Sequence, residues 1–198
     1  MQIRLPILFA LLAASMFAHA SAGIASGDVT CDMNDDITMS LNYAIPSADV
    51  GLPGAIWVAA YNPASENLDG VLTPTGWVGY FGGTYPEYAI YKNGLPGSVQ
   101  IVTDLTVLPI PYPTGDEVYI GHGILTPADE QLVQARRQAL DAARPARIAA
   151  GTWNSEYDDP SFDDQFRYAF AEHDAQVNDK KALAITLPDL ATICPPAP

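Results

Sequence analysis

The stretch Ile37-Thr38-Met39-Ser40-Leu41-Asn42-Tyr43 decides the fold of this chain. Its apolar residues stand at every second position, which is the period of a strand with one buried face. The run 55–61 is more densely apolar and predicts a strand near the centre of a sheet. Further short apolar runs between Pro and Gly turn residues predict strands at 71–72, 77–80, 88–91, 99–103, 105–107 and 118–120. Many short strands at close spacing favour an antiparallel β-sandwich over alternating β-α-β units.

Helical patterns begin only at Thr126, which is a good N-cap and is followed by proline and two acidic residues. We predict a helix over 127–143 that ends before Pro145, and its narrow apolar side predicts a position on the surface. A second helix is predicted over 161–177, with a loop over 151–159 between the two. The helical extension covers about 126–178, and a closing strand at 182–187 and a loose tail at 195–198 follow. The expected fold is mainly β, or α+β overall: an antiparallel β-sandwich with two helices inserted before the last strand.

Residues 1–22 have the three parts of a secretory signal peptide: Arg4, an apolar run over 5–17 and small residues around Ala20. This apolar run is too short to span a bilayer comfortably, and no later run approaches the required length of about 20 residues. We therefore expect one mature domain over 23–198, in the periplasm or secreted, without an integral membrane segment. The two cysteines, Cys31 and Cys194, are expected to form a disulfide in that oxidising compartment.

The charge of the chain is strongly negative, with a formal value of −14. Residues 23–135 hold thirteen acidic residues and one basic residue, Lys92. Binding to a phosphate backbone depends on clustered lysine and arginine, so nucleic acid is a poor candidate for a partner.

Aromatic residues are concentrated in the predicted strands between 57 and 91. Aromatic faces on an extracellular sandwich can stack on sugar rings or form a protein-binding patch, and Trp57, Trp77, Tyr80 and Tyr85 are the candidates for such a patch. The alternative is that these rings build the core and cross-strand pairs.

His122 lies between two glycines, at a predicted strand-to-helix junction where the imidazole could be exposed. It is the fifth candidate for a binding site, and a candidate for a catalytic site if a carboxylate lies near it, although a turn explains the glycines equally well. The chain has no Gly-x-Ser-x-Gly nucleophile motif.

An acidic cluster that includes Asp158, Asp159 and Asp163 has the oxygen chemistry that calcium prefers. The spacing is not that of an EF-hand, and acids before and at the start of a helix need no metal. No other cofactor is expected.

The segments Thr73-Pro74-Thr75-Gly76-Trp77, Gly82-Gly83 and Val118-Tyr119-Ile120-Gly121-His122-Gly123 resemble a short β-rich module of secreted and surface-associated proteins from Gram-negative bacteria. The resemblance spans roughly 54–125 and implies a small, non-enzymatic accessory unit, with His122 replacing an aromatic residue of the module.

Three functional hypotheses follow. The first is a secreted or periplasmic, disulfide-closed accessory protein that binds a protein or glycan ligand or has a structural role, without catalysis. The second is a carbohydrate-binding module or an adhesin or fibre subunit that uses exposed aromatic residues. The third is a periplasmic enzyme built around His122.

Overall fold

The computed structural model describes residues 22–83, 85–105 and 114–194. The predicted signal peptide up to residue 21, most of the predicted strand at 105–107 and the predicted tail at 195–198 lie outside these residues.

A three-stranded antiparallel sheet forms one layer of the molecule. Its strands are β1 (Ile24–Cys31), β2 (Ile37–Ala44) and β7 (Ser98–Asp104), in the order β1-β2-β7. The alternation in β2 has the expected effect, because Met39, Leu41 and Tyr43 are all fully buried. Their polar neighbours point to the opposite face of the strand.

The second layer is a larger antiparallel sheet of six strands. It contains β3 (Gly54–Asn62), β4 (Asn67–Thr73), β5 (Gly76–Gly79), β6 (Ala89–Tyr91), β8 (Glu117–Ile124) and β9 (Lys181–Thr186). The order is β5-β4-β3-β8-β9, and β6 pairs with the beginning of β3. As predicted, the densely apolar run forms a central strand.

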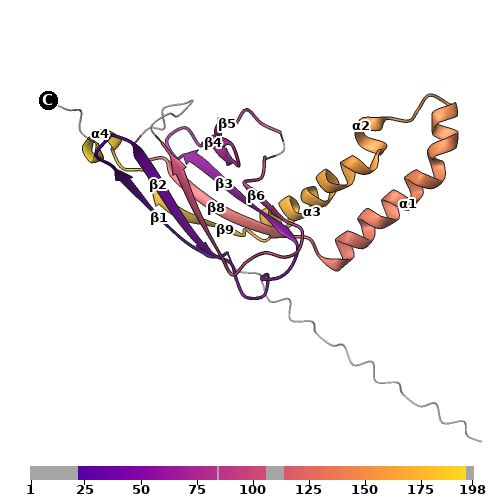
Figure 1. Cartoon of the computed structure of the whole chain (residues 1–198), viewed down its shortest axis with the longest axis horizontal. Helices are drawn as coiled ribbons and strands as arrows, with labels where there is room; N and C mark the ends of the chain where they lie inside the picture. The colour runs from indigo at the N-terminus through magenta and orange to yellow at the C-terminus, as the bar shows by residue number, and fades with distance from the viewer. Residues whose placement is uncertain (1–21, 84, 106–113, 195–198) are drawn as a thin grey trace, which may run out of the picture.

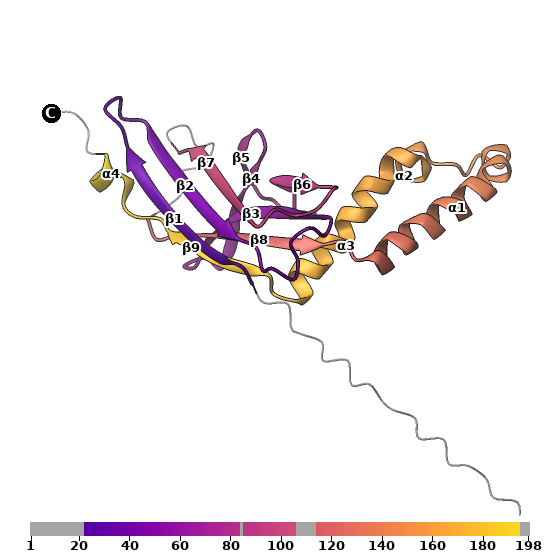
Figure 2. The same ribbon diagram turned by 60° about the horizontal axis from the view of Figure 1, so that its bottom comes forward.

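The two sheets pack face to face around one hydrophobic core, as Figures 1 and 2 show. The three-stranded sheet contributes Met39, Leu41 and Ile101, and the larger sheet contributes residues such as Val58 and Ile120. This arrangement confirms the predicted mainly-β sandwich.

Between β8 and β9 the chain forms the two predicted long helices. They are α1 (Pro127–Ala149) and α3 (Asp163–Val177), and between them lie the short helix α2 (Ser155–Asp158) and a 3-10 turn (Pro160–Phe162). Thr126 caps α1 through a reciprocal pair of hydrogen bonds with Asp129. Both views place α1 and α2 beyond one end of the sandwich, so that the helices form an arm (Figures 1 and 2).

Two helical predictions need correction. Helix α1 continues through Pro145 to Ala149, although a proline inside a helix removes a hydrogen bond and crowds the preceding turn, because other contacts hold the last turn. Arg147 in that turn pairs with Asp158 at 2.7 Å and lies over the ring of Trp153. The segment predicted as a loop over 151–159 also contains α2.

The predicted disulfide joins Cys31 and Cys194, whose Cα atoms are 5.5 Å apart. Cys194 directly follows the short helix α4 (Leu190–Ile193), at the end of the molecule opposite the helical arm (Figure 2). The bond therefore ties β1 to the segment beyond β9. Closing a loop across 163 positions stabilises the fold by about 4–5 kcal/mol in the chain-entropy description.

Candidate functional site: an aromatic cleft on the outer face of the large sheet

The outer face of the large sheet carries aromatic side chains. Ile56, Val58 and Ala60 of β3 point into the core, so the residues between and after them, Trp57 and Tyr61, point outward. Tyr119 of β8 points outward in the same way. These rings line a cleft of about 740 Å³ together with Tyr85.

Helix α3 forms one wall of this cleft through Glu172, Ala175 and Gln176. The helix comes so close to β8 that a Cβ atom at Gly123 would lie 1.8 Å from the carbonyl oxygen of Ala171. The glycines around His122 therefore serve neither to expose the imidazole nor to form a turn. Gly123 lets the backbone of α3 pack directly on β8, and this contact closes the cleft on one side, while Gly121 lies against Lys180 and Lys181 at the beginning of β9.

The cleft rings are held by contacts with one another and with the backbone. The indole Nε1 of Trp57 donates a hydrogen bond to the carbonyl oxygen of Tyr85 at 3.2 Å. The Tyr85 ring stacks on that of Tyr80, with centroids 4.8 Å apart and planes 16° from parallel. Tyr61 and Tyr119 meet edge to face, with centroids 6.5 Å apart. These contacts hold the ring faces in place before a ligand binds, and this preorganisation lowers the entropic cost of binding.

Polar groups stand among these rings. Glu66, Glu172, Gln176 and Lys181 all line the cleft. Burial raises the pKa of Glu172, although a backbone hydrogen bond with Tyr85 partly offsets that effect. The cleft thus combines apolar ring faces with hydrogen-bond donors and acceptors, which is the usual composition of a small-molecule site.

The hydroxyl of Tyr119 donates to Oε2 of Glu117 at 2.7 Å. This hydrogen bond and burial raise the pKa of Tyr119 to about 12, so the phenol keeps its proton at neutral pH.

His122 does not occupy the position expected for it. It lies inside β8 rather than at a junction, it faces the core, and its exposed fraction is 0%. Its Nε2 is 2.7 Å from Oδ2 of Asp49, and its Nδ1 is 2.6 Å from the hydroxyl of Tyr43. Burial lowers the pKa of His122, and this effect outweighs the opposite effect of Asp49. A neutral ring with Nε2–H donating to Asp49 leaves Nδ1 to accept the Tyr43 hydroxyl proton.

Lys180 extends this buried network toward the cleft. Its ammonium group, 1% exposed, lies 3.0 Å from Asp49 and 2.8 Å from Asp174 of α3. Asp174 also accepts a hydrogen bond from the backbone N–H of Ile124 at 2.9 Å. The network joins both sheets to α3, so it positions the wall of the cleft. A carboxylate does lie beside His122, as the enzyme hypothesis requires, but the enclosed imidazole offers no face to a substrate.

The four aromatic candidates for the contact patch lie in three different places in the structure. Trp57 and Tyr85 line the cleft, and Tyr80 stacks on Tyr85 from an adjoining hollow. Trp77 belongs to the core and is 7% exposed, so its assignment to the contact patch is wrong. Its position in β5 turns it inward, while the neighbouring Val78 is exposed.

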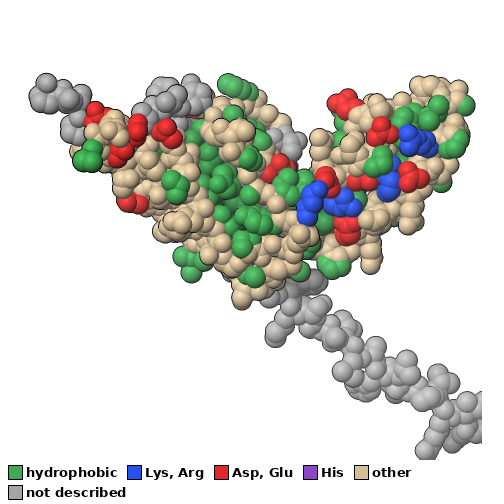
Figure 3. Space-filling model, in the orientation of Figure 1, with side chains coloured by type: hydrophobic (Ala, Val, Ile, Leu, Met, Phe, Trp, Pro, Cys, Tyr) green, Lys and Arg blue, Asp and Glu red, His purple; other side chains and the backbone are tan. Residues whose placement is uncertain are grey.

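The acidic residues considered for calcium have arginine partners from α1. Asp163 is bound by Arg136 and Arg137 at 3.0 and 2.9 Å, and Asp158 by Arg147. Asp159 lies 3.8 Å from Arg144. These guanidinium groups supply the positive charge that the calcium hypothesis gave to a metal ion. Figure 3 shows basic and acidic side chains together over the helical arm, while hydrophobic side chains gather over the sandwich.

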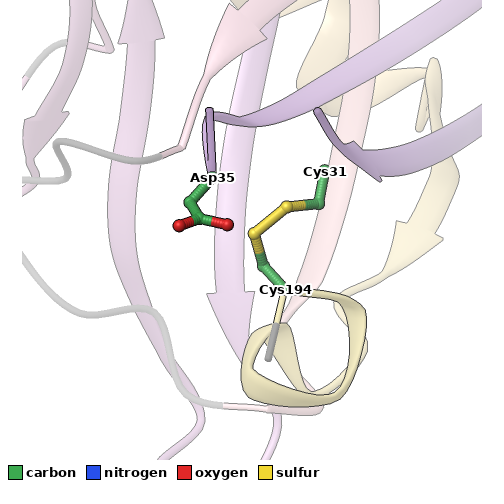
Figure 4. A group of neighbouring side chains, drawn as sticks. All are labelled: Cys31, Asp35 and Cys194. Carbon is green, nitrogen blue, oxygen red and sulfur yellow. A yellow bond between two sulfur atoms is a disulfide. The ribbon is translucent and has the colours of Figure 1, made fainter. Parts of the chain in front are cut away.

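Cys31, Asp35 and Cys194 are the only group of potential metal ligands found close together among the described residues (Figure 4). The two sulfur atoms are joined to each other, so they are not thiolate ligands.

Within the described ranges, no helix is both long and apolar enough to cross a membrane. Comparisons with protein-family models, with curated proteins and with solved structures found no match.

Several cleft residues were not predicted. Tyr61 and Tyr119 could have been found, since each alternates with core residues in a predicted strand. Glu172 and Gln176 carry no such signal, because only the packing of α3 on β8 brings them to the sheet. Lys181 reaches the cleft through the pairing of β9 with β8, which joins it to Gly121.

Proposed function

We propose that this protein is an exported, non-catalytic accessory protein that binds a carbohydrate in the aromatic cleft. The observation that carries the proposal is the set of outward-facing rings, Trp57, Tyr61, Tyr85 and Tyr119, on one sheet face with carboxylate and amide groups beside them. The signal-peptide pattern and the disulfide support export. The resemblance to a β-rich module of Gram-negative surface proteins also fits an accessory role.

The chemistry of the cleft suits a sugar. A pyranose ring offers C–H faces to aromatic rings and hydroxyl groups around its edge. Glu172 and Glu66 can accept hydrogen bonds from hydroxyl groups, and Gln176 can both donate and accept them. The negative charge of the whole chain disfavours an anionic ligand, so we expect a neutral one.

The enclosure of His122 supports binding over catalysis. Its two ring nitrogens are engaged by Asp49 and Tyr43 inside the sandwich, and none of its surface is exposed. A general base must come within hydrogen-bond reach of a substrate proton, and this ring has no path to one without opening of the core.

The test is an array of neutral and charged glycans, followed by calorimetric titration with the neutral glycan that binds best. We expect Trp57→Ala to weaken binding at least tenfold, and Trp57→Phe, which keeps a ring face, to weaken it less. Tyr157→Ala, an exposed ring on α2, is the matched control and should bind like the parent. Thermal unfolding of each variant shows whether it folds. Absence of glycan binding, or unchanged binding by folded Trp57→Ala, would refute the proposal, as would hydrolysis of the bound glycan.

A further inference from the structure

A second hollow adjoins the aromatic cleft. It has a volume of about 490 Å³ and is lined by Asn67, Leu68, Asp69, Tyr80, Phe81 and Gly82. Leu68 of β4 lines both the hollow and the cleft. The two depressions therefore share a boundary on the surface of the large sheet.

The stacked tyrosines form a second connection between them. Tyr80 lines the hollow and Tyr85 lines the cleft, and their rings lie nearly parallel with centroids 4.8 Å apart. Tyr80 is held by two further bonds, from its hydroxyl to the Gly83 carbonyl at 2.6 Å and from its N–H to the Asp69 carbonyl at 3.2 Å. Tyr85 in turn accepts the indole hydrogen bond of Trp57. Ring faces in both depressions are thus held by one connected set of contacts.

Phe81 gives the hollow its own apolar surface, with 94% of the residue exposed. Asn67 and Asp69 stand beside it with hydrogen-bonding side chains. The hollow repeats, on a smaller scale, the combination of ring faces and polar groups seen in the cleft. Each depression alone lies within the range of about 300–1,000 Å³ typical of a small-molecule site.

We propose that the cleft and the hollow form one groove, which binds a neutral polysaccharide chain through sugar subsites in both depressions. The proposal rests on the proposed function and specifies its ligand as a polymer rather than a single sugar. Two linked contacts strengthen binding because the second sugar binds at the high local concentration set by the first. The carboxylates of Glu66, Asp69 and Glu172 line the groove, and they repel uronate or phosphate groups along an acidic polymer. The two lysines of the cleft, Lys180 and Lys181, are already paired with aspartates.

The experiment is a calorimetric length series with cello-, manno-, xylo- and chito-oligosaccharides of one to six units. For the series that binds, affinity should rise at least tenfold between the shortest ligand with measurable binding and the hexamer. Phe81→Ala should remove most of this gain and leave the affinity for the shortest ligand unchanged. Trp57→Ala should weaken binding at every length. Because Phe81 is almost fully exposed, its variant is expected to fold, and thermal unfolding checks this.

Several results separate this proposal from the proposed function. Affinity that is the same at all lengths and is lost on Trp57→Ala would leave a glycan-binding cleft but overturn the extended groove. The groove is also overturned if Phe81→Ala binds the hexamer like the parent, or if polygalacturonate binds more tightly than the neutral series. Failure of every oligosaccharide to bind overturns both proposals.

Discussion

His122 of β8 and Tyr43 of β2 meet across the two sheets, with the histidine Nδ1 2.6 Å from the tyrosine hydroxyl. This contact joins the layers of the sandwich through a buried hydrogen bond. The same buried network includes Asp49, Lys180 and Asp174. These residues extend the connection to α3, which forms one wall of the aromatic cleft. The residue that suggested an active site is part of the framework behind the cleft.

Substitution of His122 by Gln should alter how stability depends on pH. The pKa of His122 is lowered below its ordinary value of 6.5, so the folded state holds fewer protons on this ring than the unfolded chain does. The stability that the histidine contributes is therefore full above about pH 6.5 and is lost as the pH falls through the folded-state pKa. We expect His122→Gln to be less stable than the parent at pH 7.5, and the gap to narrow toward pH 4.5. Urea unfolding across this range measures it, and a constant gap would contradict the neutral, buried ring.

Asp116, directly before β8, should have the opposite effect on the pH dependence of stability. It is 1% exposed, and among the described residues its Oδ2 has no hydrogen-bond partner. Burial, with a contribution from the charge of Asp69, raises its pKa to about 6. Ionisation therefore destabilises the folded state as the pH rises from about 4 to 6. Asp116→Asn should be more stable than the parent by about 1–3 kcal/mol at pH 7, with no difference near pH 4. Equal stability of the two proteins at pH 7 would count against this assignment.

Lys180 should be far more important for stability than its neighbour Lys181. Lys180→Met leaves the carboxylates of Asp49 and Asp174 without their ammonium partner, and breaking a buried pair in this way costs about 3–5 kcal/mol. Lys181 pairs with Asp179 on the surface, so Lys181→Met should change stability by less than about 1 kcal/mol. Chemical denaturation at pH 7 compares the two variants, and similar losses would show that the buried network has no special role.

Gly123 should not tolerate even a methyl group. Gly123→Ala places a Cβ atom 1.8 Å from the Ala171 carbonyl oxygen, so α3 must move away from β8. A loss of about 3 kcal/mol is expected from this overpacking, together with weaker glycan binding because the cleft wall shifts. Gly97→Ala is the control, since a Cβ atom there meets nothing within 4 Å. A Gly123→Ala protein as stable as Gly97→Ala would show that helix and strand are not in this close contact.

The candidate site was predicted only in part. The aromatic-rich strands were recognised, and Trp57 and Tyr85 do line the cleft. Alternation places two residues on opposite faces but does not say which face meets a second sheet, so Trp77 was assigned to the surface although it lies in the core. His122 was misplaced for a related reason. Its flanking glycines suggested an exposed loop, whereas the lack of a side chain at Gly123 admits the backbone of α3 and Gly121 lies against Lys180 and Lys181.

The local pattern of the chain by itself determined most of the strands, although not β1 (Ile24–Cys31), and also the start of α1 at Thr126 and the pairing of the two cysteines. These features depend on period-two burial, on capping chemistry and on the count of thiols, all of which are properties of short segments or of composition. Only the tertiary structure decided that Glu172 and Gln176 face the rings of the large sheet and that Lys180 closes a network with Asp49 and Asp174. Those contacts join residues far apart in sequence, and they exist because α3 packs on the glycine-lined face of β8.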